Sequence, residues 1–173
     1  RRGSSDLPYA PGVSELMAAR AQMGSSLAFH ICFSVLGIGM PLLLLIAEGL
    51  WLRTGRDVYR DLARSWGKAF AVTFAVGAAS GTMLSFELGL LWPRFMEFAG
   101  GIIGMPFSFE GFAFFIEAIF LALYLYGWDR LTPRAHFLCG IPLVIGGFAS
   151  TFFIVSANAW MNTPTGFTLG PDG

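Results

Sequence analysis

The chain has 173 residues and no net charge, and 55% of its residues are hydrophobic while only 13% are charged. A soluble domain carries about 25% charged residues, and a nucleic-acid-binding surface needs an excess of basic charge. The composition therefore excludes a typical soluble domain and indicates no nucleic-acid partner. Long apolar runs cross lipid as helices or closed barrels, and these runs are too continuous for barrel strands. An all-α membrane protein is predicted.

Four apolar segments follow one another, at about residues 25–52, 69–92, 107–127 and 133–158. Each is long enough for a tilted transmembrane helix, which needs about 20 apolar residues. The sequence thus predicts an integral membrane helix bundle, with four transmembrane helices of a longer multi-helix subunit. Residues 1–24 are expected to form an extracytoplasmic N-terminal segment, and residues 163–173 a truncated extracytoplasmic loop.

The first segment contains His30, whereas the other histidine, His136, lies at the edge of the fourth. A buried histidine in a membrane helix commonly makes an interhelical hydrogen bond, but a neutral imidazole is also a haem ligand. Spacing alone leaves both interpretations open. Pro41 is expected to kink this helix, and Glu48, near its inner end, is expected to lie at the membrane interface. Cys32 is expected to be a small buried hydrophobe, as is Cys139 in the fourth segment.

Basic residues define the predicted orientation. Residues 53–68 carry five of them and the third loop carries Arg130 and Arg134, whereas residues 93–106, expected to be a glycine-rich loop, carry only Arg94. The positive-inside rule places the first and third loops in the cytoplasm and the N-terminus outward. Charges at helical spacing also predict a short interfacial helix within residues 53–68.

The second segment combines a packing motif with an acidic residue. Gly77 and Gly81 form a small-xxx-small pattern, which favours close contact with another helix. Glu87 lies near the predicted outer end, where it either reaches the interface or serves a function. In the fourth segment, Thr132 and Pro133 predict a helix start. Pro142 is expected to kink that helix, and Gly146 and Gly147 to allow close packing or room for a flat cofactor.

Glu110 and Glu117 lie in the third segment, seven residues apart and on one helical face. Their separation along the helix axis is about 10 Å. A carboxylate at membrane depth is costly, and its usual uses are to carry protons, neutralise a cation or line an ion path. By residue count, His30 falls between the two glutamates in depth, and Glu87 lies at a similar level. The sequence therefore predicts a cluster of ionisable groups in the outer half of the membrane.

Several motifs, in this order, resemble the N-terminal part of subunit I of the cytochrome bd quinol oxidases. They are Arg20-Ala-Gln22 leading to His30, Tyr59-Arg60-Asp61 with Trp66-Gly67-Lys68, Phe74-Ala-Val-Gly77 to Gly81, Glu110-Gly111 with Phe114-Phe115-Ile116-Glu117, Gly127-Trp128-Asp129-Arg130, and Asn158-Ala-Trp160-Met161-Asn162-Thr-Pro164. The resemblance covers most of the chain, but only the first four of the nine helices of such a subunit.

The resemblance implies roles for three residues. His30 corresponds to a histidine that ligates the iron of one high-spin haem, and Glu110 and Glu117 to carboxylates beside the haems that ligate them or pass protons. In many members the two glutamates are eight residues apart, compared with seven here. The implied cofactors are haems of the b and d types. The ligands of the low-spin haem and the quinol-binding loop correspond to positions beyond Gly173.

The implied protein is a multi-pass enzyme of the bacterial inner membrane, with a subunit II as partner and lipid around it. It oxidises quinol on the outer side, reduces oxygen to water with protons from the cytoplasm, and so generates a proton gradient. The fragment alone is expected to be inactive. Two alternatives are kept: a proton-coupled transporter or channel fragment that uses Glu110 and Glu117 without haem, and a purely structural membrane subunit.

Overall fold

The computed structural model describes residues 14–168 and 170, and these fold into four long helices. The helices are α1 (Glu15–Thr54), α2 (Asp57–Leu91), α3 (Pro93–Gly127) and α4 (Pro133–Asn162). Each is long and apolar enough to cross a membrane. No strand occurs among the described residues, and the predicted all-α bundle is confirmed.

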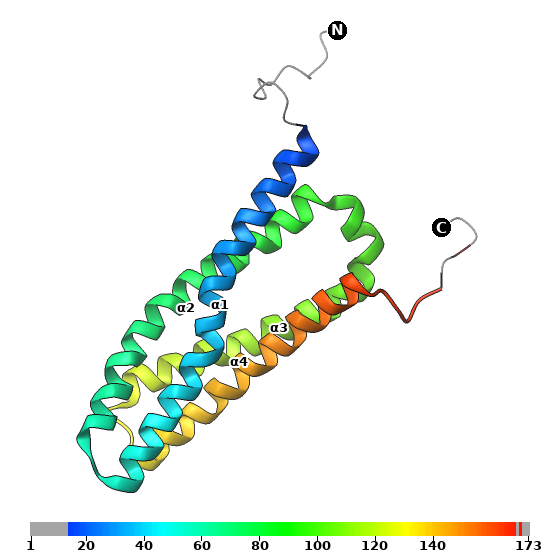
Figure 1. Ribbon diagram of the computed structural model, residues 1–173. Helices are drawn as coiled ribbons and strands as arrows, with labels where there is room; N and C mark the ends of the chain where they lie inside the picture. Colours follow the sequence, from blue (N-terminus) through cyan, green and yellow to red (C-terminus); the bar gives the residue numbers. More distant parts are fainter. Residues whose placement is uncertain (1–13, 169, 171–173) are drawn as a thin grey trace.

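The helices form two antiparallel hairpins, α1–α2 and α3–α4 (Figure 1). Contacts are densest within each hairpin, and the hairpins meet through α1 against α4 and α2 against α3. Figure 1 shows the hairpins close together at the end that holds the α1–α2 turn and the α3–α4 connection, and diverging toward the other end. We call the end that holds the α1–α2 turn and the α3–α4 connection the turn end.

The helices extend well beyond the apolar segments. A short interfacial helix was predicted within residues 53–68, but residues 57–68 are the first turns of α2. Residues 93–106, predicted as a loop, are the start of α3. Only Trp92 separates α2 from α3. The early part of α3, before Pro106, bends across to the end of α4 (Figure 1), where Ala99 and Ile103 are buried against Ala157. The membrane-spanning limits within these helices stay predictions.

Local sequence signals explain the helix ends. The Ser14 hydroxyl accepts a hydrogen bond from the Met17 backbone N–H at 3.2 Å and caps α1. At the other end, Gly55 has a φ of 67°, a left-handed conformation that glycine adopts without steric cost, and its N–H donates to the Trp51 carbonyl. Thr132 caps α4, which begins at Pro133 as predicted.

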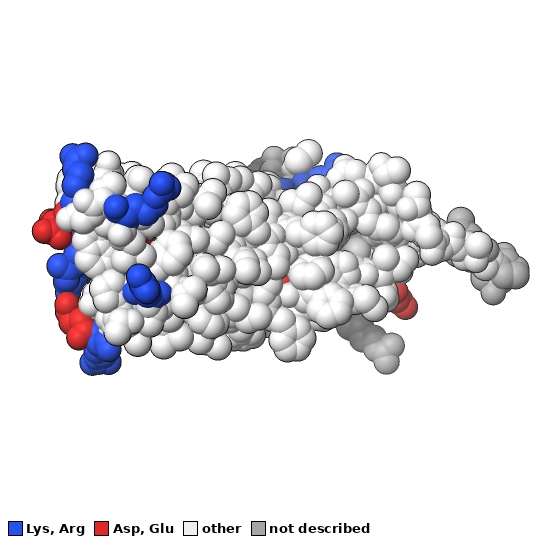
Figure 2. Space-filling model, turned by 90° about the horizontal axis from the view of Figure 1, so that it is seen from below, with Lys and Arg blue, Asp and Glu red and all other residues white. Residues whose placement is uncertain are grey.

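The main buried cluster draws residues from all four helices near the turn end: Leu44, Phe70, Leu121, Tyr124 and Leu143. Most other large apolar side chains face outward, as expected for a surface in contact with lipid or further helices. Figure 2 shows most of the visible basic side chains, together with several acidic ones, gathered at one end of a long and largely uncharged flank. Both thiols are free, but Cys32 is exposed, so its expected burial is wrong, while Cys139 is partly buried.

Candidate functional site

His30 lies in the seam between α1 and α2. Its Nδ1 is 2.9 Å from the Ser80 hydroxyl of α2, and its Nε2 is 2.8 Å from the Ser34 hydroxyl one turn further along α1. The motif glycines make this approach possible, since a Cβ on Gly81 would lie only 3.0 Å from the Cε1 atom of His30. Gly77 likewise faces Phe33 of α1. The predicted close packing at this motif is confirmed.

The two serines leave His30 with neutral partners on both sides. Each hydroxyl is also close to a helix carbonyl, Ser80 at 3.0 Å from that of Gly77 and Ser34 at 3.0 Å from that of His30 itself. A hydroxyl has one hydrogen and can accept as well as donate, so either serine can accept the ring N–H while donating to its carbonyl. The other ring nitrogen then presents a lone pair. Among the described residues, no other ionisable side chain forms a hydrogen bond with this ring.

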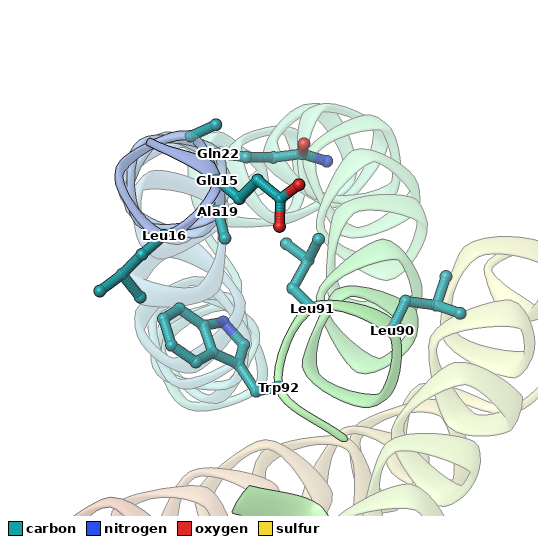
Figure 3. Close-up of a pocket in the computed structure, with 8 residues that line it drawn as sticks. Glu15, Leu16, Ala19, Gln22, Leu90, Leu91 and Trp92 are labelled. Atoms are coloured by element: carbon teal, nitrogen blue, oxygen red, sulfur yellow. The ribbon is translucent and has the colours of Figure 1, made fainter. Parts of the chain in front are cut away.

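Glu87 is buried further along the same seam. Its Oε1 accepts hydrogen bonds from the Ser26 hydroxyl at 2.7 Å and the Gln22 side-chain amide at 3.2 Å. Only 4% of the residue is exposed, and Oε2 is buried without a partner, so Glu87 does not reach the surface of the chain. Beyond Gln22 lies a pocket of about 540 Å³ between the start of α1 and the end of α2 (Figure 3). It is lined by apolar side chains of both helices and by the polar side chains of Glu15 and Gln22.

Glu110 and Glu117 lie in the other seam, between α3 and α4. The Ser150 hydroxyl donates to Oε1 of Glu110 at 3.1 Å. Glu117 is 4% exposed, and its Oε1 is buried with no hydrogen-bond partner. Gly146 and Gly147 of α4 pack directly against Glu117: a Cβ on Gly146 would lie 3.0 Å from the Glu117 backbone nitrogen. These two glycines therefore let α4 close over the carboxyl.

The structure does not bring His30 into contact with either glutamate. His30 belongs to the α1–α2 seam and both glutamates to the α3–α4 seam, and no Cα atom of α1 lies within 8 Å of one of α3. The ionisable groups predicted to share one depth thus lie in two polar seams of the described helices, and their common depth stays a prediction. The roles of His30, Glu110 and Glu117 stay predictions at this point.

Sequence reasoning missed a third polar site near the turn end. Glu48 is fully buried, so its predicted interfacial position is wrong, and its Oε1 is 2.7 Å from Nδ1 of His136. The other ring nitrogen of His136 lies 2.8 Å from the Tyr124 carbonyl of α3. The helical spacing of Glu48 from Pro41 and Leu44 could have indicated its burial, because all three lie on the buried face of α1.

The two seams contain side chains of the kind that the implied haem would need. Among the described residues, no three His, Cys, Asp or Glu side chains gather as a metal-binding group. Haem iron needs only axial side-chain ligands, because the macrocycle supplies the others. His30 offers a neutral nitrogen whose only partner on one side is a rotatable hydroxyl, and Glu117 offers an unpartnered buried oxygen. The chemistry of these residues fits the group.

Long apolar helices that bury three glutamates and a histidine define a multi-pass membrane protein with a polar interior. A family model, cytochrome bd terminal oxidase subunit I, matches residues 18–173. The chain belongs to this family. The four long apolar helices and the family membership together indicate a multi-pass protein of the bacterial plasma membrane.

Individual relatives agree with the family match. The chain is 38% identical, over 91% of its length, to the cytochrome bd ubiquinol oxidase subunit 1 of Bacillus subtilis, of which it covers 34%. It is 37% identical, over 86% of its length, to the cytochrome bd-II ubiquinol oxidase subunit 1 of Escherichia coli, of which it covers 29%. The bd oxidase structure from Geobacillus thermodenitrificans matches 91% of this chain with a TM-score of 0.88 and 44% identity, and the match covers 37% of that chain. The chain therefore spans about a third of these relatives.

Proposed function

We propose that the chain is part of the haem-binding subunit of a quinol:oxygen oxidoreductase of the cytochrome bd type. The whole complex would oxidise quinol, reduce oxygen to water and generate a proton gradient. One observation carries the proposal beyond family membership: a membrane-type bundle buries Glu117 with an unpartnered carboxyl oxygen, although burying an ionisable group in this way is costly. Such groups persist where protons or ions must be handled.

His30 is proposed as the axial ligand of a high-spin haem. The ring packs against Gly81, and the hydroxyl of Ser80 or Ser34 can hold one ring N–H. The other serine hydroxyl would have to rotate away for the second ring nitrogen to bind iron. This is the arrangement in which a second hydrogen bond orients a metal-binding histidine. When bound, haems of the b and d types would supply the centre at which electrons reach oxygen.

Glu110 and Glu117 are proposed to line the cofactor side and to hold protons for oxygen reduction. Their spacing of about 10 Å along α3 is too long for direct transfer between them, so intermediate donors are required. Ser150 supplies one hydroxyl at Glu110. Glu117 is enclosed by Gly146 and Gly147, which keep bulky side chains away from its carboxyl.

The proposed orientation follows the distribution of charge. The basic residues of loops one and three lie at the turn end, which is assigned to the cytoplasm, and the N-terminus then faces outward. The expected partners are membrane lipid and a second membrane-spanning subunit, with quinol and oxygen as substrates.

The alternative is a proton-coupled membrane transporter or channel fragment. The observation that favours it is the separation of the α3–α4 carboxyls from His30, because Glu110 and Glu117 form a polar seam that does not depend on the histidine. In this alternative the two glutamates would line an ion path without haem.

An optical experiment on the complete subunit, purified with its partner subunit, separates the two functions. A reduced-minus-oxidised spectrum with haem bands that shift on adding carbon monoxide would support the oxidase. The His30→Ala variant should then lose a high-spin signal and keep the low-spin one. A well-folded complex without haem bands would reject the oxidase, and proton uptake into liposomes without haem would establish the transporter.

A further inference from the structure

The connection between α3 and α4 carries the motif Gly127-Trp128-Asp129-Arg130, to which the proposed function assigns no role. Its first two residues pack into the bundle. A Cβ on Gly127 would lie 2.9 Å from Cδ1 of Leu131 and 3.1 Å from Cδ2 of His136, so the glycine allows both side chains to come close. The Trp128 ring lies against the ring of His136, with centroids 4.0 Å apart. The start of the motif therefore fixes the end of α3.

The two charged residues of the motif differ in their partners. Asp129 forms an ion pair with Arg64 of α2 at 2.6 Å. Arg130 is exposed, and within residues 14–168 and 170 its guanidinium takes part in no ion pair and no side-chain hydrogen bond. Its backbone is held in place, because the N–H of Arg130 donates to the Gly127 carbonyl at 3.0 Å. The connection thus presents a cation at a fixed position whose charge is not neutralised by the described helices.

Arg130 lines a groove on the outer face of α3. The groove has a volume of about 330 Å³ and is lined by Ala122, Leu123, Tyr126, Gly127, Arg130 and Leu131. The lining positions on α3 recur at helical spacing, so they form one strip along the helix. Tyr126 is 73% exposed and Leu123 is 46% exposed, so the other three helices leave this strip open. Pockets that bind small molecules have volumes of about 300–1,000 Å³, and the groove is at the lower end of this range.

The chemical character of the groove changes along its length. Ala122 and Leu123 lie in the apolar part of α3, Tyr126 follows about one turn later, and Arg130 comes last. Tyrosine is enriched where the hydrocarbon meets the lipid headgroups, and basic side chains beyond it bind those headgroups. The order from apolar side chain to phenol to guanidinium matches the order from acyl chain to glycerol to phosphate in a phospholipid. A soluble anion would leave the apolar part of the groove uncovered.

The surroundings of the groove favour a negatively charged headgroup. Basic residues outnumber acidic ones at the turn end, where most of the visible basic side chains gather (Figure 2). Arg134, at the start of α4, is a further exposed residue that forms no ion pair in the described part of the chain. A guanidinium group binds phosphate through two parallel hydrogen bonds. The cytoplasmic leaflet, to which the turn end is assigned, attracts such groups through its anionic lipids.

We propose that this groove is a binding site for an anionic phospholipid. The phosphate binds Arg130, the Tyr126 hydroxyl lies at the level of the glycerol, and the first part of one acyl chain lies against Leu123 and Ala122. The lipid neutralises the charged residue of the motif that has no partner within the described bundle, and it ties the α3–α4 connection to the membrane. The site requires neither haem nor oxidase activity.

Two variants remove the site in different ways, and each has a matched control. Arg130→Gln removes the charge of an exposed side chain, whereas Ala122→Phe fills the apolar part of the groove from an exposed position and keeps the charge. Arg56→Gln is the control for charge, since Arg56 lies over the Tyr59 ring at the start of α2 and does not line the groove. Leu138→Phe is the control for size, because it enlarges an exposed side chain of α4 outside the groove.

The test is an electron cryo-microscopy map of the complete subunit with its partner, in nanodiscs of equal parts phosphatidylglycerol and phosphatidylcholine. Lipid density with its phosphate at Arg130 is expected in the wild type and both controls, and is expected to be absent in Arg130→Gln and Ala122→Phe. A protein segment in the groove, an empty groove, or a phosphate-sized feature without an acyl chain would overturn the proposal. So would the same lipid density in nanodiscs of phosphatidylcholine alone.

Native mass spectrometry of the delipidated complex, titrated with phosphatidylglycerol, measures the contribution of the charge. Arg130→Gln should need about 5-fold more of this lipid than the wild type to recover the molecule that it loses, since one basic residue near a membrane surface contributes about that factor. Equal titrations of Arg130→Gln and Arg56→Gln would overturn the role of Arg130. A complex that lacks haem would refute the proposed function, while the lipid density and the titration would still decide this site.

Discussion

Oε1 of Glu48 on α1 and Nδ1 of His136 on α4 are 2.7 Å apart, and their side chains are 0% and 2% exposed. The other nitrogen of the same ring lies 2.8 Å from the Tyr124 carbonyl on α3. Because a carbonyl only accepts, Nε2 must carry a hydrogen. One proton is then shared between Nδ1 and Glu48, and a single imidazole ring connects three helices.

Replacing either member of this pair should destabilise the bundle. Glu48→Ala or His136→Ala leaves a polar partner buried and unpaired, which typically costs about 3–5 kcal/mol. Thermal unfolding of the purified complex in detergent, followed by tryptophan fluorescence, measures the loss. The double variant should lose much less than the sum of the two single variants, and simple additivity would show that the two residues do not interact.

Glu117→Gln should lower oxidase turnover by about 100-fold, because an amide keeps the shape of the side chain but cannot carry a transferable proton. Oxygen uptake with quinol as donor measures the effect, and haem content is checked by the optical spectrum. Glu97→Gln is the control, since Glu97 lies on the same helix and is exposed. Wild-type rates in Glu117→Gln would refute the proton-transfer role.

Gly146→Ala should push α3 and α4 apart. The added Cβ would lie 3.0 Å from the Glu117 nitrogen and 3.1 Å from the Ala113 carbonyl oxygen, and these backbone atoms cannot rotate away. Overpacking of this kind costs about 1–3 kcal/mol, measured as a lower unfolding temperature. Gly104→Ala, with nothing within 4 Å, should instead be neutral or stabilising by up to about 1 kcal/mol. Equal effects would contradict the packing argument.

Replacing Ser80, which contacts His30, should weaken haem binding, whereas replacing Ser85 on the same helix should not. If the Ser80 hydroxyl orients the ring, Ser80→Ala should weaken haem retention about 10- to 100-fold and shift the iron–histidine stretching frequency in resonance Raman spectra. Ser80→Thr should restore both. Ser85→Ala is the control, since that exposed hydroxyl bonds only to the Gly81 carbonyl. An unchanged frequency in Ser80→Ala would assign the orienting role elsewhere.

Arg64 and Asp129 form the other ion pair of the described residues, and it should matter little for stability. The two atoms are 2.6 Å apart, but the side chains are 38% and 69% exposed. Exposed pairs contribute about 0.2–1 kcal/mol and are screened by salt. A double-mutant cycle with Arg64→Ala and Asp129→Ala should therefore give a coupling within this range that falls in 1 M salt. A coupling above about 2 kcal/mol would indicate that the pair is shielded in the complete complex.

The apolar runs were sufficient to predict the number and order of the helices, because each run is long and continuous. They could not place the start of α3, since Gly100, Gly101 and Gly104 have low helix propensity and look like a loop. Burial of Ala99 and Ile103 against α4 offsets that preference. Tertiary packing of residues far apart in the chain therefore decides a local conformation.

The contacts of the buried polar residues could not be predicted from the sequence either. Depth counting placed His30 and the glutamates at one level, but level does not specify the direction in which each side chain points. His30 turns toward Ser80, while Glu110 turns toward Ser150. The pairing of Glu48 with His136 spans 88 residues of sequence, and neither residue carries a local signal for the other.

The contacts within each hairpin imply an order of events during synthesis. Glu87, His30 and Glu110 find their hydrogen-bond partners on the adjacent helix of their own hairpin, so each hairpin can enter the lipid with these groups already paired. Glu48 is the exception, because its partner is translated 88 residues later. At a synthesis rate of about 5–20 residues per second, His136 is translated roughly 4 to 18 seconds after Glu48. The Glu48–His136 bond is therefore expected to form last, when the second hairpin joins the first.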